Sequence, residues 1–443
     1  MRIPSSTTRR GARFYGGPGE GPRRIEFGNH AVLDGRGVVN GLVDALPAVA
    51  ADLLEIATVA YAVDRMVPRP SERDAEKNGG WGRKLRVEVA VREPAIWQRH
   101  GELLSGFLHW LTDDLWSFEF AQLDPGSGPL DARQGVLFDV LPAGVRPALV
   151  SGGLDSACGL YFQLAQHDTV AVSVHTNNWM QHIQQGIISS LGVSASHSAV
   201  PLRYRVCLPQ GGAEASQRTR GFLFLSAGAA TALALQSDGL SVFENGIGSL
   251  NLPYLRSQQG AQATRSMHPR TLNLMVELVC AITGRAFQIV APYRGLTKAE
   301  LLSGVSSDAD EILARTVSCD TGFAARVKNR RPCGKCTSCL LRRQAVLASG
   351  RTFLDDVVSY RDQTMEGVAL SAMLWQVLRL RECLSAQQPW AYLVDGFPEL
   401  MYAQAYMKPG EIIRLYRRYV QEWDSLMETF PISRAWVYGK DGG

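Results

Sequence analysis

The chain has 443 residues, of which 46% are hydrophobic and 20% are charged, and its formal net charge is +4. This length predicts more than one domain, and the composition is that of a globular protein with a large core. The small net charge gives no whole-protein footprint for nucleic acid or a membrane surface, so we expect neither as a partner. The sequence lacks a long apolar run and an apolar signal segment, which predicts no membrane span and a cytoplasmic location.

The first 140 residues contain helix and strand patterns but no group of residues typical of a catalytic site. Residues 1–30 are rich in Arg, Gly, Ser and Pro, and we expect a flexible basic tail there. Helical spacing of apolar residues runs up to Met66, with Pro47 in the first turn, and recurs over residues 97–111. Strands are predicted at residues 85–91, 115–120 and 136–140. We therefore predict an added α+β domain over residues 31–140.

The most informative stretch is the SGGLDS loop (residues 151–156), which lies between a short apolar strand pattern and a helical pattern. A strand, a glycine turn and a helix start form an anion site, because the first backbone N–H groups of the helix have no helical partner. The glycines allow the backbone to approach a ligand, and Ser151 and Ser156 add hydroxyl donors for phosphate oxygens. Asp155 suits a phosphate when a divalent cation lies between them. The alternative is an ordinary strand–turn–helix corner.

Further strands are predicted at residues 169–174, 240–243 and 287–290. With residues 148–150 they predict a doubly wound parallel sheet, in which ligands bind at the carboxyl ends of the strands. Glu244 and Asn245 follow the strand at 240–243 and are candidates for binding a planar ring through hydrogen bonds.

Two segments carry cations near a predicted helix start. Arg218 and Arg220 begin an alanine-rich helix, where positive charge is unfavourable unless it meets an anion such as phosphate. The alternative for both is exposure to solvent. Thr297 and Glu300 form a capping-box pattern, which leaves Lys298 in the first turn, beside either an anion or solvent.

Four cysteines follow the spacing C-x13-C-x2-C-x2-C: Cys319, Cys333, Cys336 and Cys339. The short gaps bring thiolates to one centre, and four sulfur ligands favour a closed, structural zinc site. An iron–sulfur cluster is the alternative, and a redox pair is disfavoured because the third evenly spaced cysteine has no role in it. Five basic residues would offset the negative charge of a zinc tetrathiolate: Arg330, Arg331, Lys335, Arg342 and Arg343.

The SGGLDS loop resembles the pyrophosphate-binding loop of the ATP pyrophosphatase group, and a Walker loop is excluded because no Gly-Lys-Ser/Thr is present. Together with Lys298, Ser318 and the four cysteines, the loop resembles the 7-cyano-7-deazaguanine synthase (QueC) family over roughly residues 147–345. The resemblance implies an adenine nucleotide alpha hydrolase (HUP/PP-loop) fold over residues 141–345. It further implies ATP as substrate, Mg²⁺ as helper and structural Zn²⁺ at the cysteines.

On this basis we assign roles to individual residues. Catalytic roles are predicted for Asp155, Ser151 and Lys298. ATP binding is predicted for Ser151, Gly152, Gly153, Leu154, Asp155, Ser156, Arg218 and Arg220. Substrate binding is predicted for His182, Glu244 and Asn245.

The family's reaction activates 7-carboxy-7-deazaguanine as an adenylate, after which ammonia displaces AMP and a second ATP-dependent step gives the nitrile. Residues 178–182 (NWMQH) and Gln185 stand where the family has YGQRH and a glutamate, so only His182 is retained. The added segment before the loop and the helical C-terminal region at 346–443 resemble the QueC-like proteins of anti-phage operons such as the Qat system.

The resemblance therefore suggests an enzyme of anti-phage defence that adenylates a 7-deazaguanine carboxylate and transfers it to an amine of a protein partner from the same operon. One alternative is 7-cyano-7-deazaguanine synthesis for queuosine. Another is tRNA thiolation by the same type of loop, which the small net charge disfavours. A third is a non-catalytic nucleotide-binding scaffold of a defence complex.

Overall fold

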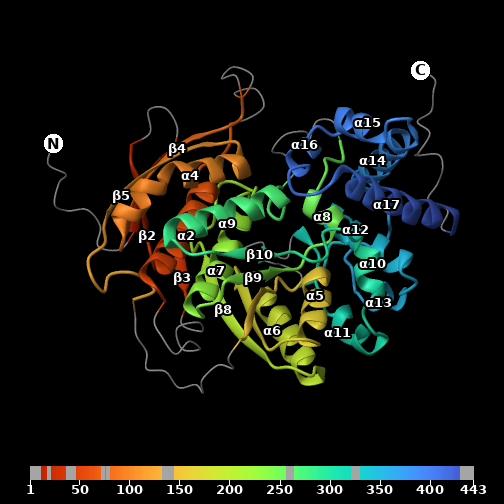
Figure 1. The fold of residues 1–443 in the computed structure, drawn as a ribbon, viewed down its shortest axis with the longest axis horizontal. Helices are drawn as coiled ribbons and strands as arrows, with labels where there is room; N and C mark the ends of the chain where they lie inside the picture. The colour runs from red at the N-terminus through yellow and green to blue at the C-terminus, as the bar shows by residue number, and fades with distance from the viewer. Residues whose placement is uncertain are drawn as a thin grey trace.

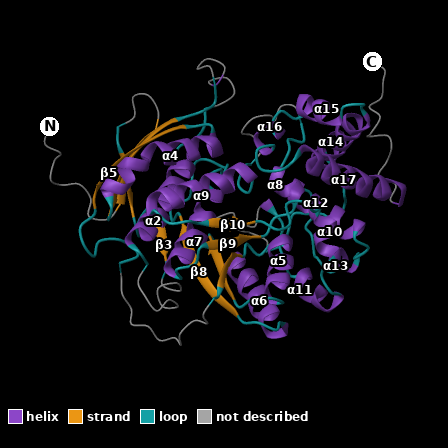
Figure 2. Cartoon of the chain, viewed as in Figure 1, coloured by secondary structure: helices purple, strands orange, loops and turns teal. Residues whose placement is uncertain are grey.

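The computed structural model describes residues 11–16, 21–35, 46–70, 75, 80–131, 144–255, 264–320 and 330–429. It is a mixed α/β structure with two sheets and a separate group of helices near the C-terminus (Figures 1 and 2). None of the helices within the described ranges is long and apolar enough to span a membrane.

The larger sheet has six strands in the order β10-β9-β6-β7-β8-β3. Its members are β3 (Val32–Asp34), β6 (Arg146–Leu149), β7 (Thr169–His175), β8 (Ala199–Cys207), β9 (Gly239–Val242) and β10 (Gln288–Val290). All neighbouring pairs are parallel except β3 and β8, which are antiparallel. The predicted parallel sheet is confirmed in these portions.

Helices cover both faces of this sheet, as the burial of β7 requires. Every residue of β7 is buried, and its alternate side chains enter different cores. Val172 packs in the core that includes α7 (Arg220–Ala234) and α9 (Pro269–Thr283), whereas Ala171 packs in the core with α5 (Leu154–Leu164) and α6 (Asn178–Ser194).

The smaller sheet is formed by N-terminal strands in the order β2-β1-β4-β5. Its members are β1 (Gly11–Gly16), β2 (Arg23–Glu26), β4 (Lys84–Val91) and β5 (Leu115–Gln122). The prediction of a flexible tail over residues 1–30 is therefore wrong for β1 and β2. Phe14 and Ile25 are fully buried, so these short strands are held by apolar side chains that alternate with arginines. Residues 1–10 lie outside the described ranges.

The N-terminal elements share one hydrophobic core with the larger sheet. The helices α2 (Ala48–Met66) and α4 (Pro94–Thr112) pack on α7 and α9 respectively. Phe107 contacts Phe222 edge-on with ring centroids 5.2 Å apart, and the indole of Trp110 donates to Thr271 Oγ1 at 2.9 Å. Residues from both segments thus form a continuous core, and the domain boundaries drawn from the sequence stay predictions.

The helices and strands predicted at residues 85–91, 97–111 and 115–120 are confirmed by β4, α4 and β5. Pro47 is the N-cap of α2, in agreement with its predicted place at the helix start. Neither α6 nor β8 was predicted from the sequence. Buried Leu202, Tyr204 and Val206 alternate with Arg203 and Arg205 along β8, a strand pattern that follows Pro201 and was overlooked. The strand predicted at residues 136–140 lies outside the described residues.

The described part of the chain after β10 is mostly helical, and the helical region predicted from the sequence comprised only residues 346–443 of it. Its elements are α10 (Lys298–Ser303), α11 (Asp310–Ala314), α12 (Thr337–Ala348), α13 (Phe353–Asp356), α14 (Val368–Ser385), α15 (Pro389–Gly396), α16 (Leu400–Ala403) and α17 (Pro409–Thr429). The apolar stripe of α17, which includes Tyr419 and Trp423, is buried against α12 and α14. The apolar spacing of this helix in the sequence therefore reflects core packing.

Candidate ATP-binding cavity and cysteine centre

A cavity of about 460 Å³ opens at the carboxyl edge of the larger sheet. The loop after β6, the residues after β9, the start of α10 and the start of α12 all contribute to its walls. Because ligands of open α/β sheets bind outside the carboxyl ends of the strands, this is the expected place for a substrate.

The SGGLDS loop leads from β6 into α5 through a turn that requires glycine. Gly152 has a φ of +86°, and a Cβ there would lie 3.2 Å from side-chain atoms of both Gln184 and Met180. The Gln184 amide donates to the carbonyls of Ser151 (3.1 Å) and Val174 (3.0 Å), which fixes α6 against the loop. The backbone of the loop is therefore held from outside and is free to present its N–H groups to the cavity.

Hydroxyl groups lie at the first N–H groups of α5. Ser151 Oγ accepts from the Gly153 N–H at 3.3 Å, and Ser318 Oγ accepts from the Leu154 N–H at 3.3 Å. Ser156 Oγ lies 3.1 Å from Ser151 Oγ. These are long hydrogen bonds at a helix N-terminus, and a phosphate oxygen would be a stronger acceptor for the same donors.

Asp155 is the electrostatic centre of the cavity floor. Its Oδ2 accepts hydrogen bonds from Lys298 Nζ and from Asn245 Nδ2, the latter at 3.1 Å. Its Oδ1 is buried and has no hydrogen-bond partner among the described residues. Glu244 lies beside it, and burial together with the charge of Asp155 raises the pKa of Glu244 well above its usual value. An orphaned carboxylate oxygen next to a second carboxyl group fits a hard divalent cation such as Mg²⁺.

Lys298 reaches this network because of how α10 begins. Thr297 caps the helix and forms the predicted capping box with Glu300, so Lys298 lies in the first turn. Only 7% of Lys298 is exposed, and its ammonium pairs with Asp155. Lys298 was predicted to lie beside either an anion or solvent, and the anion, the carboxylate of Asp155, is confirmed. Asn245 is placed similarly, because its Oδ1 caps α8 (Gly246–Leu250) while its amide group reaches Asp155.

The structure does not bring all predicted site residues to the cavity. Arg220 lines it, whereas Arg218 packs on the ring of Trp81, with its Cζ 4.5 Å from the ring centroid. Burial lowers the pKa of Arg218 to about 10. His182 is exposed on α6, since Met180 and Gln184 occupy the face of that helix that packs on the loop.

Residues missing from the sequence-based assignment also line the cavity. Ser318 and Asp320 flank Cys319, and Ser338 lies within the cysteine motif. Ser318 was singled out by the family resemblance without a role, whereas for Asp320 and Ser338 the available signal was their position next to the clustered cysteines.

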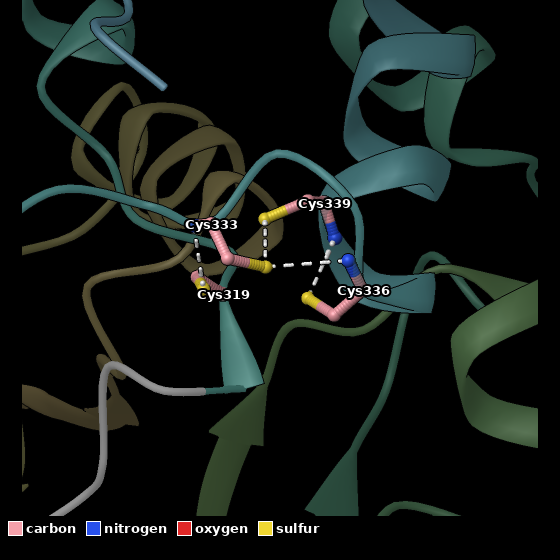
Figure 3. A group of neighbouring side chains, drawn as sticks. All are labelled: Cys319, Cys333, Cys336 and Cys339. Carbon is pink, nitrogen blue, oxygen red and sulfur yellow. Dashed lines mark hydrogen bonds between the residues drawn. The ribbon is translucent and has the colours of Figure 1, made fainter. Parts of the chain in front are cut away.

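The four cysteines form a single centre beside the cavity (Figure 3). Their sulfur atoms all lie within 4.8 Å of one another. Backbone N–H groups of Cys333, Cys336 and Cys339 each donate to the sulfur of the preceding cysteine, at 3.3, 3.2 and 3.4 Å. Gly334 makes this turn possible, because its φ is +83° and a Cβ would lie 2.0 Å from the carbonyl oxygen of Asp362.

The chemistry of this donor set fits a tetrahedral metal ion. Hydrogen bonding with Cys319 and Cys339, together with burial, raises the pKa of the Cys336 thiol. Four sulfur ligands are typical of structural zinc. Arg343 was predicted to offset the negative charge of the cysteine centre. Its Nε instead pairs with Asp355 Oδ2 at 2.9 Å. Arg342 instead donates to Thr316 Oγ1 and the Leu313 carbonyl.

Fold and site thus define a mixed α/β protein with a glycine-containing strand–turn–helix loop at the carboxyl edge of its parallel strands and, beside it, a four-cysteine cluster that could hold a metal ion. Residues 265–350 match the family model described as "Queuosine biosynthesis protein QueC". The matched segment contains Lys298, Ser318 and the four cysteines, whereas the SGGLDS loop lies outside it. The match supports QueC-family membership and indicates a QueC-like, ATP-using synthase-type function. A search of curated proteins gives no match.

Proposed function

We propose that the protein uses ATP to adenylate a 7-deazaguanine carboxylate, 7-carboxy-7-deazaguanine, and transfers the acyl group to an amine. The observation that carries this proposal is the buried ion pair between Asp155 of the SGGLDS loop and Lys298. Both residues line the cavity that the cysteine centre borders. The QueC match over residues 265–350 supports the substrate class. We assign the larger sheet to the adenine nucleotide alpha hydrolase type.

In the first step, a carboxylate oxygen of the substrate attacks the α-phosphorus of ATP. The bond to the bridging oxygen breaks, and pyrophosphate leaves with the electron pair. The N–H groups of Gly153 and Leu154 and the hydroxyls of Ser151 and Ser156 would hold the leaving pyrophosphate, and their grouping at the start of α5 supports this role. Lys298 would compensate the charge of Asp155. Bound Mg²⁺, held by Asp155, would supply further positive charge for the phosphates.

In the second step, the amine nitrogen attacks the acyl carbon, AMP leaves with the former carboxylate oxygen, and the nitrogen loses a proton to give an amide. We infer that the amine belongs to a partner protein, in a role resembling that of QatC-like anti-phage proteins. Two features support this inference: the departure of residues 178–182 from the family pattern, and the added segments that flank the matched region.

The test is incubation of the protein with ATP, Mg²⁺ and 7-carboxy-7-deazaguanine, followed by measurement of AMP and pyrophosphate. We expect both products from the natural chain and neither from Asp155→Ala. An Asp155→Ala protein that keeps ATP binding but loses function would also exclude a purely nucleotide-sensing scaffold. Formation of the nitrile with ammonia alone, read by product mass, would favour queuosine biosynthesis instead. Absence of nucleotide turnover with any partner would contradict the proposal.

A further inference from the structure

A second polar group lies in the cavity, away from the network around Asp155. Asp320 and Ser338 both line the cavity, and Ser338 Oγ donates to Asp320 Oδ1 at 2.6 Å. The two residues are neighbours of Cys319 and Cys339 in the chain. Both members of this hydrogen-bonded pair thus stand next to residues of the cysteine centre.

The electrostatic neighbours of Asp320 differ from those of Asp155. Asp155 and Lys298 act on Glu244, whereas Asp320 acts on Arg220 and Tyr254. Burial lowers the pKa of Arg220, and the carboxylate of Asp320 works in the opposite direction. The cavity thus has two polar ends with separate charges.

The two ends are nevertheless close enough for one small molecule to contact both. Ser318 Oγ accepts from the Leu154 N–H of the SGGLDS loop at 3.3 Å, and Asp320 is two residues further along the chain. Two residues of extended chain span at most about 7 Å. A bicyclic base can therefore hold its carboxylate at the phosphate end while its opposite edge meets Asp320.

We propose that Asp320, oriented by Ser338, is the specificity-determining residue that binds the N1–H and 2-amino edge of the 7-deazaguanine base. This inference rests on the proposed function. An ionised carboxylate only accepts hydrogen bonds, and Asp320 Oδ1 already receives one from Ser338, which fixes the plane of the group. The two adjacent N–H donors of a guanine-like base match it, whereas adenine presents a donor beside an acceptor and does not. Asp320 would thus also keep ATP out of the subsite for the base.

Glu244 is the competing carboxylate of the cavity. Its Oε1 receives the Asn245 amide at 3.1 Å, and it lies against Asp155 at the phosphate end. A base bound there would place its carboxylate away from the loop. The geometry therefore favours Asp320 for the base.

The experiment compares binding of 7-carboxy-7-deazaguanine with binding of its analogue that lacks the 2-amino group, by calorimetry on the full chain. We expect the natural chain to bind the analogue about 10- to 100-fold more weakly, as for loss of hydrogen bonds to a charged group. Asp320→Asn should bring this ratio close to one, and Ser338→Ala should reduce it less. The metal content and the ATP affinity should remain unchanged in both variants, which a merely structural role would not allow.

An unchanged ratio in Asp320→Asn, or loss of the ratio in Glu244→Gln instead, would overturn the inference. So would a natural chain that binds neither base. The proposed function fails separately: a natural chain that discriminates between the bases through Asp320 but forms no AMP would refute adenylation and leave the recognition role intact. If the natural chain forms AMP but the ratio of affinities for the two bases is unchanged in Asp320→Asn, adenylation is supported and the recognition role of Asp320 is refuted.

Discussion

Asp155 is a carboxylate at a place where a bound nucleotide would bring further negative charge. Its hydrogen-bond partners explain how a negative side chain can be accommodated at this position. Lys298 and Asn245 bind one oxygen, and the other oxygen has no hydrogen-bond partner within the described part of the chain. Lys298 is 143 positions away from Asp155 in the sequence. Asp155 can therefore offer its free oxygen to a cation while Lys298 holds the other oxygen.

Substitution of Lys298 should show how far activity and stability depend on its ion pair with Asp155. In Lys298→Gln the buried carboxylate of Asp155 is left without its cation, so we expect adenylation to fall by about 10²- to 10³-fold and the free energy of unfolding to fall as well. The double variant with Asp155→Asn should regain stability but not activity. Lys84→Gln, at an exposed position of β4, is the matched control. Equal stability of the single variant and the natural chain in urea would argue against a buried ion pair.

A second buried carboxyl group makes stability depend on pH. Glu55 of α2 is 2% exposed, and burial raises its pKa from 4.5 to about 7, against the opposing effect of Arg92. The folded chain therefore binds a proton that the unfolded chain releases between these pH values. The contribution to stability is complete below pH 4.5 and falls by at most about 3 kcal/mol as pH rises through 7.

Glu55→Gln cannot titrate and should flatten this part of the pH profile. The measurement is urea unfolding of both proteins at pH 5 and pH 8. We expect the natural chain to lose more stability than the variant between the two conditions. Parallel profiles would show that Glu55 is ionised in the folded chain at both pH values.

At the scale of elements, short loops between regular elements carry the site. The sequence predicted the SGGLDS loop, the capping box of α10 and the cysteine cluster, because each depends on residues close together in the chain. It did not predict that Gln184 of α6 supports the loop or that Ser318 contacts Leu154, since these contacts depend on how distant segments pack. Arg218 and His182 were also singled out from local sequence, but neither lies at the cavity. Arg218 packs against Trp81, and His182 is exposed on α6.

Gly152→Ala tests whether the loop needs its left-handed turn. Because Gly152 has a φ of +86° and an added Cβ would press on side chains of α6, the substitution should lower the free energy of unfolding by about 1 kcal/mol or more. It should also weaken ATP binding at least several-fold. Gly126→Ala is the matched control, with a φ of +72° and no atom within 4 Å of the added Cβ. It should lose similar stability and keep its ATP affinity. If both variants bind ATP normally, the loop does not hold the nucleotide.

Cys336→Ser tests the metal centre. One of four ligands is removed, so we expect the zinc content per chain, measured by elemental analysis, to fall and the thermal midpoint to drop with it. Cys280→Ser, at a half-buried cysteine outside the centre, should change neither. Visible absorption that disappears with the substitution would instead indicate an iron–sulfur cluster.

At the scale of the whole molecule, the N-terminal segment shares one of the described hydrophobic cores with the larger sheet, whereas the C-terminal helices form another. β3 illustrates this arrangement, because it is early in the chain yet pairs with β8 at the edge of the larger sheet. The added α+β domain over residues 31–140 was predicted from local patterns alone, and these patterns do not indicate which helix faces pack against each other. The shared core holds α7 in place, and α7 carries Arg220 into the cavity.

The central claim is that this cavity activates a carboxylate at the expense of ATP. The most direct measurement is exchange of labelled pyrophosphate into ATP, which requires only the first, reversible step and no amine. We predict exchange that depends on 7-carboxy-7-deazaguanine and Mg²⁺ and that is absent in Asp155→Ala. Exchange without the base, or none in its presence, would contradict the account.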